Sequence, residues 1–105
     1  MLRKADPARA IIGQIASALL PSKSELIEAK MIDWSSATFT GARHEFDIIV
    51  HGAEAVRDAG AFVQSVTTIE FTIGGHIVAD IKAQFVSGDE ESARLHVEAL
   101  TVEAD

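Results

Sequence analysis

The chain contains 105 residues, of which 48% are hydrophobic and 24% are charged, a composition typical of one compact globular domain. Its formal net charge is −7, and its nine Lys and Arg residues are scattered, which argues against the clustered basic surface that nucleic acids and anionic membranes require. The absence of cysteine excludes disulfides, thiolate metal sites and cysteine nucleophiles, and it suits a cytoplasmic location. We therefore expect a single domain over residues 1–105, with no nucleic-acid or membrane partner.

The first predicted element is a helix that begins after Asp6. Asp6 is a good helix cap, and Pro7 fits the first turn because a helix leaves the N–H of that position unpaired. Apolar residues then recur every three or four positions and form one stripe, namely Ala8, Ile11, Ile12, Ile15 and Leu19. Polar residues interrupt this short run, so it predicts a core helix that ends at Pro21 rather than a signal peptide or a membrane span.

Residues 25–39 are predicted to be extended and to form a hairpin with the strand that follows. Gly41-Ala42 suits a two-residue turn, in which Thr40 would face Arg43. This register places on one sheet face Ala37, Phe39, Phe46, Ile48 and Val50. The opposite face would carry Arg43, Glu45 and Asp47 near the turn, and farther away Ile32, Trp34 and Ile49.

A second helix is predicted over residues 53–65, followed by an extended connector over residues 67–73. The helix would turn Val56, Ala59, Phe62, Val63 and Val66 toward the core. Gly60 lies inside it at a cost of roughly 1 kcal/mol relative to alanine, which suggests either a close approach to the sheet or an early helix end. The connector alternates polar and apolar residues before Gly74-Gly75, so an additional edge strand is an alternative there.

The second hairpin has the clearest alternation in the chain. Its buried face is predicted to carry Ile77, Ala79, Ile81, Ala83, Phe85, Ala93, Leu95, Val97 and Ala99. The opposite face carries polar residues near an acidic turn, namely Lys82, Gln84, Arg94, His96 and Glu98. Beyond them that face becomes apolar at Val78, Leu100 and Val102.

The two halves of the chain have the same order of elements. Residues 37–43 contain an Ala-x-Phe, Gly, Ala-Arg pattern that recurs over residues 83–94 with four residues inserted at the turn. Two helix-strand-strand units predict an α+β fold, with one antiparallel sheet and both helices on one face. The order of elements resembles a circularly permuted ferredoxin-like arrangement, which is a fold analogy and implies no activity.

The uncovered sheet face is predicted to be an interface. Six apolar side chains are assigned to it, namely Ile32, Trp34, Ile49, Val78, Leu100 and Val102. Several hundred Å² of apolar surface is about as much as monomers leave exposed, so we expect another molecule to cover it. A second copy of the chain is the leading candidate, which predicts a homodimeric interaction or assembly protein with Trp34 as anchor. A different protein partner is one alternative, and a monomer in which terminal residues or residues 67–73 cover this face is the other.

A small-ligand or metal site on the same face is the second hypothesis, and it implies a binding protein or a small enzyme. Its candidate residues are His51, His76, Asp80, His96 and Glu98, since histidine and carboxylate suit zinc or iron. An ordinary surface ladder, in which Lys82 pairs with Glu98, explains the same pattern. Phosphate loops, dinucleotide fingerprints and nucleophile elbows are absent from the sequence, so we expect no cofactor and favour a non-enzymatic role.

Overall fold

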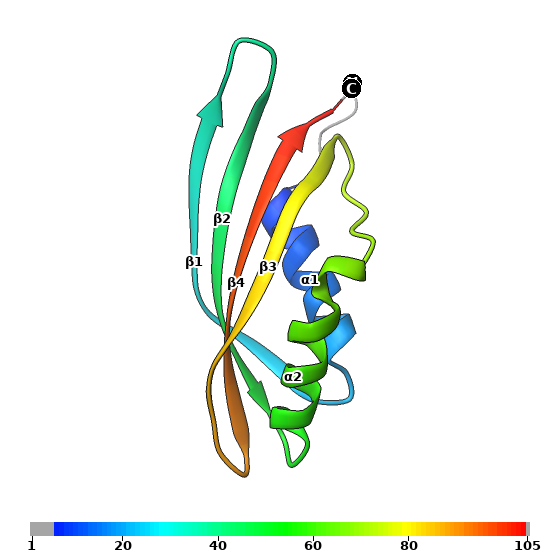
Figure 1. Ribbon diagram of the computed structural model, residues 1–105, viewed down its shortest axis with the longest axis vertical. Coiled ribbons are helices and arrows are strands. Elements are labelled where there is room, and N and C mark those ends of the chain that lie inside the picture. The colour runs from blue at the N-terminus through cyan, green and yellow to red at the C-terminus, as the bar shows by residue number, and fades with distance from the viewer. Residues whose placement is uncertain (1–5, 105) are drawn as a thin grey trace.

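A computed structural model describes residues 6–104 of the chain as two helix-strand-strand units. The elements are α1 (Pro7–Leu19), β1 (Lys23–Ser35), β2 (Thr40–His51), α2 (Ala55–Ser65), a 3-10 turn (Val66–Thr68), β3 (His76–Gly88) and β4 (Ser92–Glu103). The four strands form one antiparallel sheet in the order β1-β2-β4-β3. Both helices lie on the same side of this sheet (Figure 1). The predicted α+β fold with two helices and an antiparallel sheet is therefore confirmed.

Each helix turns one stripe of side chains toward the sheet. The Asp6 carboxylate caps α1 by accepting hydrogen bonds from the backbone N–H groups of Ala8 and Arg9, at 3.0 and 3.3 Å. In α1 the buried residues are Ile11, Ile15 and Leu19, as the periodicity predicts. In α2 they are Ala55, Ala59 and Phe62. Val56 is exposed, contrary to prediction. The buried stripe of α2 starts at Ala55 rather than at Val56, so Val56 points away from the core.

The hydrophobic core lies between the helices and the inner face of the sheet. On the central strands β2 and β4 every second side chain is buried, in agreement with the predicted alternation. The buried set includes Phe46, Ile48 and Val50 from β2, and Leu95 and Val97 from β4. Full burial of one side chain of this size contributes about 1.5–3 kcal/mol to the free energy of unfolding, so these two strands make a large contribution to stability.

The turn of the first hairpin lies earlier than predicted. Ser35 pairs with Thr40, and the N–H of Ser36 donates to the carbonyl of Phe39 at 2.7 Å. Gly41 is therefore a strand residue, and Phe39 is 57% exposed in the turn rather than buried. The second turn closes in the same way, since the N–H of Asp89 donates to the carbonyl of Ser92 at 2.9 Å. The two turns thus match in length, and the predicted four-residue insertion is wrong.

Two irregularities in β3 correct the predicted faces of that strand. The pairing with β4 shifts between Val78 and Asp80 and again between Phe85 and Ser87. Such a bulge adds a residue to one strand and reverses the faces of the residues beyond it. Ile77 therefore pairs with Val102 on the outer face and is 57% exposed. Val78 packs against the core instead of facing outward as predicted.

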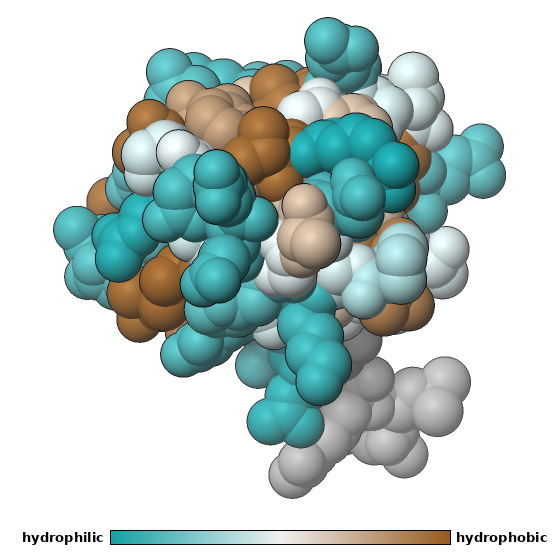
Figure 2. Space-filling model, turned by 90° about the horizontal axis from the view of Figure 1, so that it is seen from below, coloured by the Kyte–Doolittle hydropathy of each residue, from teal (hydrophilic) through white to brown (hydrophobic). Residues whose placement is uncertain are grey.

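The molecule is elongated, with principal extents of 47 × 24 × 23 Å. The β1–β2 hairpin extends beyond both helices at one end (Figure 1). At the opposite end, hydrophobic areas of the surface are separated by hydrophilic ones (Figure 2). Within residues 6–104, no helix combines the length and the apolar character that crossing a bilayer requires.

Candidate functional site

Cross-strand pairing arranges the outer face of the sheet in rows that run across all four strands. Residues that pair directly point to the same side, so each row can be followed from β1 through β2 and β4 to β3. Near the β1–β2 turn, one row contains Trp34, Gly41, Val102 and Ile77. The next rows contain Ile32, Arg43, Leu100 and Asp80, then Lys30, Glu45, Glu98 and Lys82, then Glu28, Asp47, His96 and Gln84. The outer face thus has an apolar end and a charged centre.

The apolar end consists of Ile32, Trp34, Ile77, Leu100 and Val102. A shallow depression of about 480 Å³ lies among Ile32, Trp34, Arg43 and Leu100. Trp34 lies beside Gly41. A Cβ atom at position 41 would lie only 2.9 Å from Cζ2 of the Trp34 indole, so the glycine leaves the space that the ring needs. The indole N–H of Trp34 is buried and has no hydrogen-bond partner among residues 6–104. Trp34 is therefore held by packing, with no polar contact within the described chain.

Four of the six predicted interface residues belong to this apolar end, and the other two do not. Ile32, Trp34, Leu100 and Val102 are its predicted members, and Ile77 was missed because of the β3 bulge. Ile49 is on the outer face but pairs with Arg94, on the far side of the charged rows. Val78 faces the core, as described above.

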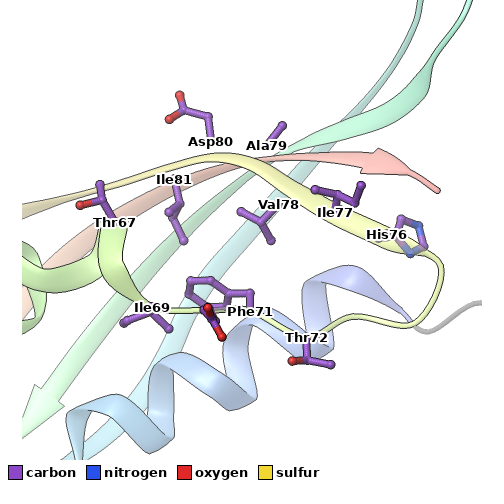
Figure 3. A pocket seen from close by; sticks show the side chains of 11 residues that line it. Thr67, Ile69, Phe71, Thr72, His76, Ile77, Val78, Ala79, Asp80 and Ile81 are labelled. Atoms are coloured by element: carbon purple, nitrogen blue, oxygen red, sulfur yellow. The ribbon is translucent and has the colours of Figure 1, made fainter.

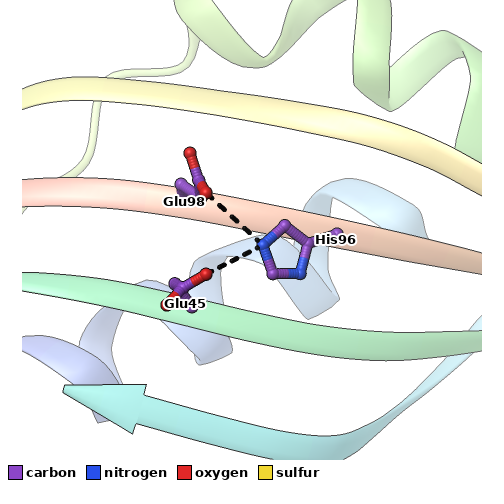
Figure 4. Close-up of side chains that lie close together, drawn as sticks. All are labelled: Glu45, His96 and Glu98. Carbon is purple, nitrogen blue, oxygen red and sulfur yellow. Dashed lines mark ion pairs between the residues drawn. The ribbon is translucent and has the colours of Figure 1, made fainter.

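The charged centre gathers carboxylates from β2 and β4 around His96 (Figure 4). The Nε2 atom of His96 is 3.3 Å from Glu45 Oε1 and 3.6 Å from Glu98 Oε1. The Nδ1–H on the other side of the ring donates to Asp47 Oδ1 at 2.8 Å. This hydrogen bond is the main reason why the pKa of His96 is raised, and the charges of Asp47, Glu45 and Glu98 add to it.

Lys82 completes the charged centre from β3. Its Nζ is 3.0 Å from Glu98 Oε2, which confirms the pairing predicted for a surface ladder. This contact is the main cause of the lowered pKa of Glu98. Glu98 therefore uses one oxygen for Lys82 and the other for His96. A depression of about 120 Å³ lies between Lys82, Gln84, His96 and Glu98 and opens this centre to solvent.

The other predicted ligand residues lie apart from His96 and Glu98. The Nε2 atom of His51 is 3.1 Å from Glu25 Oε1, near the end of the sheet opposite the apolar end. His76 pairs with Glu103 at the start of β3, and its Nδ1 is 3.1 Å from the carbonyl oxygen of Gly74. Asp80 pairs with Leu100 in a row nearer the apolar end. Within residues 6–104, the one group of three that suits a metal is Glu45, His96 and Glu98.

A fourth histidine, His44, is fully buried on the inner face. Its Nε2 is 3.0 Å from Thr101 Oγ1, and the Thr101 hydroxyl donates to the carbonyl of Ala42 at 3.3 Å. The hydroxyl oxygen therefore accepts from Nε2–H, which leaves Nδ1 as a buried acceptor with no hydrogen-bond partner among the described residues. Burial is the main cause that lowers the pKa of His44.

A cleft of about 540 Å³ runs between β3 and residues 67–72 (Figure 3). Residues 67–73 form a connector, and the alternative of an additional edge strand is not observed, since within residues 6–104 this segment pairs with β3 only through the bridge between Ile73 and His76. The side chain of Gln14 holds the connector instead. Its Nε2 donates to the carbonyl of Thr72 at 2.8 Å, and its Oε1 accepts from the N–H of Thr72 at 3.0 Å.

The architecture is similar to that of one solved protein. The fold resembles that of PilO. The crystal structure of the type 4 fimbrial biogenesis protein PilO from Pseudomonas aeruginosa superposes with a TM-score of 0.54, at 17% sequence identity, over 92% of this chain and 68% of that chain. At this identity the similarity to PilO concerns the fold alone. The sequence matches no protein-family model and has no significant match among curated proteins.

Proposed function

We propose that this protein is an interaction or assembly protein that forms a homodimer through the apolar end of its outer sheet face. The observation that carries the proposal is the contiguity of Ile32, Trp34, Leu100 and Val102 on a face that neither helix covers. Burying about 400 Å² of such surface contributes on the order of 10 kcal/mol before the costs of association, at about 25 cal/mol per Å².

The exposed edge strand β1 supports the same proposal. Ile32 on its outer side is 61% exposed because no helix covers that face, and Met31 on its inner side is 55% exposed because the hairpin extends beyond the helices. Most of the charged residues of β1 and its bulge lie nearer its start, so the part of this edge strand that is open to another chain is the apolar segment at Met31, Ile32 and Trp34. PilO, the structural neighbour, is described as a biogenesis protein of type 4 fimbriae, and an assembly role for the present chain would be of the same class.

The fold supports two further parts of the proposal. Moving β4 to the front of the chain would give the order strand-helix-strand-strand-helix-strand of ferredoxin-like domains, so we infer a circular permutation of that arrangement. Side chains of both helix-strand-strand units belong to one hydrophobic core, which favours a single domain over residues 1–105.

The test compares two exposed β-branched residues on the edge strands. Ile32, in the apolar end, is 61% exposed, and Val86, elsewhere on β3, is 59% exposed. We expect light scattering after size exclusion to give a dimer for the wild type and for Val86→Glu, and a monomer for Ile32→Glu. The fluorescence of Trp34, the single tryptophan of the chain, should shift to longer wavelength only in Ile32→Glu.

Circular dichroism establishes that both variants are folded. A wild-type protein that stays monomeric at high micromolar concentration would contradict the proposal. Equal dissociation of the dimer by Ile32→Glu and Val86→Glu would also contradict it, because the interface would then not be confined to the apolar end.

A further inference from the structure

The charged centre has an arrangement of donor atoms that self-association leaves unexplained. The Nε2 atom of His96 faces Glu45 Oε1 and Glu98 Oε1, and one ligand atom from each of the three residues lies within 4.8 Å of the others (Figure 4). Two come from β4 and one from β2, and their backbone positions are fixed by adjacent rows of a paired sheet. One imidazole nitrogen and two carboxylate oxygens are a ligand set found in zinc sites of proteins.

Two of the three separations between these atoms are those of a tetrahedral metal site. Zinc bonds of about 2.0–2.2 Å at tetrahedral angles separate the ligand atoms by roughly 3.3–3.5 Å. The Nε2 atom of His96 lies 3.3 Å from Glu45 Oε1 and 3.6 Å from Glu98 Oε1. The carboxylate oxygens of the two glutamates lie within 4.8 Å of each other, and rotation of these partly exposed side chains can adjust that separation to fit a metal ion.

Neighbouring side chains hold two of the three ligands in position. Asp47 accepts the Nδ1–H of His96 and fixes the orientation of the ring, so that a metal ion that displaces the proton of Nε2 can bind its lone pair. Lys82 holds Glu98 through Oε2, so that Oε1 is directed toward His96. The depression beside His96 and Glu98 gives room for water as a further ligand.

We propose that Glu45, His96 and Glu98 bind a divalent transition-metal ion of the zinc type, with water completing the coordination and Asp47 orienting the histidine. The nitrogen ligand favours such an ion over Mg²⁺ or Ca²⁺, which prefer oxygen ligands alone. All three ligands come from one chain, so the site is independent of the proposed dimer. The metal would link β2 to β4 at the centre of the sheet.

The test titrates metal-free protein with Zn²⁺ in a calorimeter. The wild type should bind one ion per chain with saturation, and His96→Ala should lose saturable binding. His51→Ala is the matched control, since His51 is also exposed on the outer face and paired with a carboxylate, yet belongs to no such group of three within residues 6–104. It should bind as the wild type does. Asp47→Asn should weaken the affinity by roughly 10–100-fold, as expected for a residue that orients a ligand.

Two further measurements identify the site itself. Co²⁺ should give the intense visible absorption of a tetrahedral complex with the wild type and not with His96→Ala. Ile32→Glu should keep its zinc affinity even as a monomer, which separates this proposal from the proposed dimer. The proposal is overturned if the wild type shows no saturable binding, if His96→Ala binds normally, or if His51→Ala loses binding to the same extent.

Discussion

His44 and His96 lie on opposite faces of the same sheet, and their surroundings shift their pKa values in opposite directions. His44 is buried against the core with a single hydrogen bond, so its neutral form is favoured and its pKa is lowered. His96 is partly exposed among carboxylates, of which Asp47 accepts its Nδ1–H, so its charged form is favoured and its pKa is raised. The face that a strand residue occupies therefore decides its chemistry.

The shift at His44 predicts that acid destabilises the protein. A histidine in the unfolded chain has a pKa near 6.5, so below about pH 6.5 the unfolded chain takes up a proton more readily than native His44 does. The free energy of unfolding should therefore fall as the pH falls below about 6.5, with a slope of at most about 1.4 kcal/mol per pH unit from this residue. Among the charges around His44, Asp6 and Asp33 oppose this shift and His76 adds to it.

Urea unfolding at several pH values, with EDTA present, measures this dependence. His44→Gln should remove part of the loss of stability in acid. His96→Gln should act in the opposite sense, because a raised native pKa stabilises the fold below about pH 6.5, and this stabilisation is lost as the pH rises through the native value. A His44→Gln profile parallel to that of the wild type would contradict the assignment of His44 as a buried neutral histidine.

At the scale of single elements, glycines within the helices and strands have different roles. Gly60 lies in the middle of α2, which continues to Ser65, and a Cβ at this position has no heavy atom within 4 Å. Neither the close approach to the sheet nor the early helix end expected from the sequence is observed. Gly41 lies in β2 beside Trp34, and a Cβ there would collide with the carbonyl oxygen of Thr101.

These two glycines predict opposite effects of the same substitution. Gly60→Ala should raise the free energy of unfolding by up to about 1 kcal/mol, because alanine reduces the backbone freedom of the unfolded chain and its methyl group meets no neighbour among the described residues. The Tm should rise by up to about 4–8 °C. Gly41→Ala should lower the free energy of unfolding by about 1–3 kcal/mol, because the backbone of β4 must move. Thermal unfolding followed by circular dichroism measures both. Destabilisation by Gly60→Ala would show that α2 packs more tightly there than the structure indicates.

At the scale of the whole molecule, the apolar end carries charges that suit pairing with a second copy. Arg43 and Asp80 lie on either side of Leu100 in one row of the outer face. Neither makes an ion pair with any residue between 6 and 104. A two-fold axis near Leu100 would bring Arg43 of each copy close to Asp80 of the other, since such an interface uses the same patch twice.

A charge exchange tests this arrangement of the proposed dimer. Arg43→Glu alone should weaken dimerisation at least tenfold, about 1.4 kcal/mol, because it places two acidic groups together. The double variant with Asp80→Arg should restore the dissociation constant to within about threefold of the wild type, as sedimentation equilibrium would show. A double variant that dimerises no better than Arg43→Glu would exclude this two-fold pairing.

The sequence by itself determined the order of the elements and the faces of the regular strands. The period of α1 and the alternation of β2 and β4 are local properties, so Ile15, Phe46 and Val97 could be assigned to the core without any knowledge of their neighbours. The outer-face positions of Trp34, His96 and Leu100 followed from the same alternation.

Only the tertiary structure decided which strands are neighbours and where their pairing is irregular. The β2–β4 pairing brings Glu45 and Asp47 to His96, although about 50 residues of chain separate them, and nothing in either hairpin alone indicates it. The bulge in β3 exchanges Ile77 and Val78 between faces. Both features depend on contacts between distant parts of the chain. The periodicity of the sequence, in contrast, shows only which face of its own helix or strand each residue occupies.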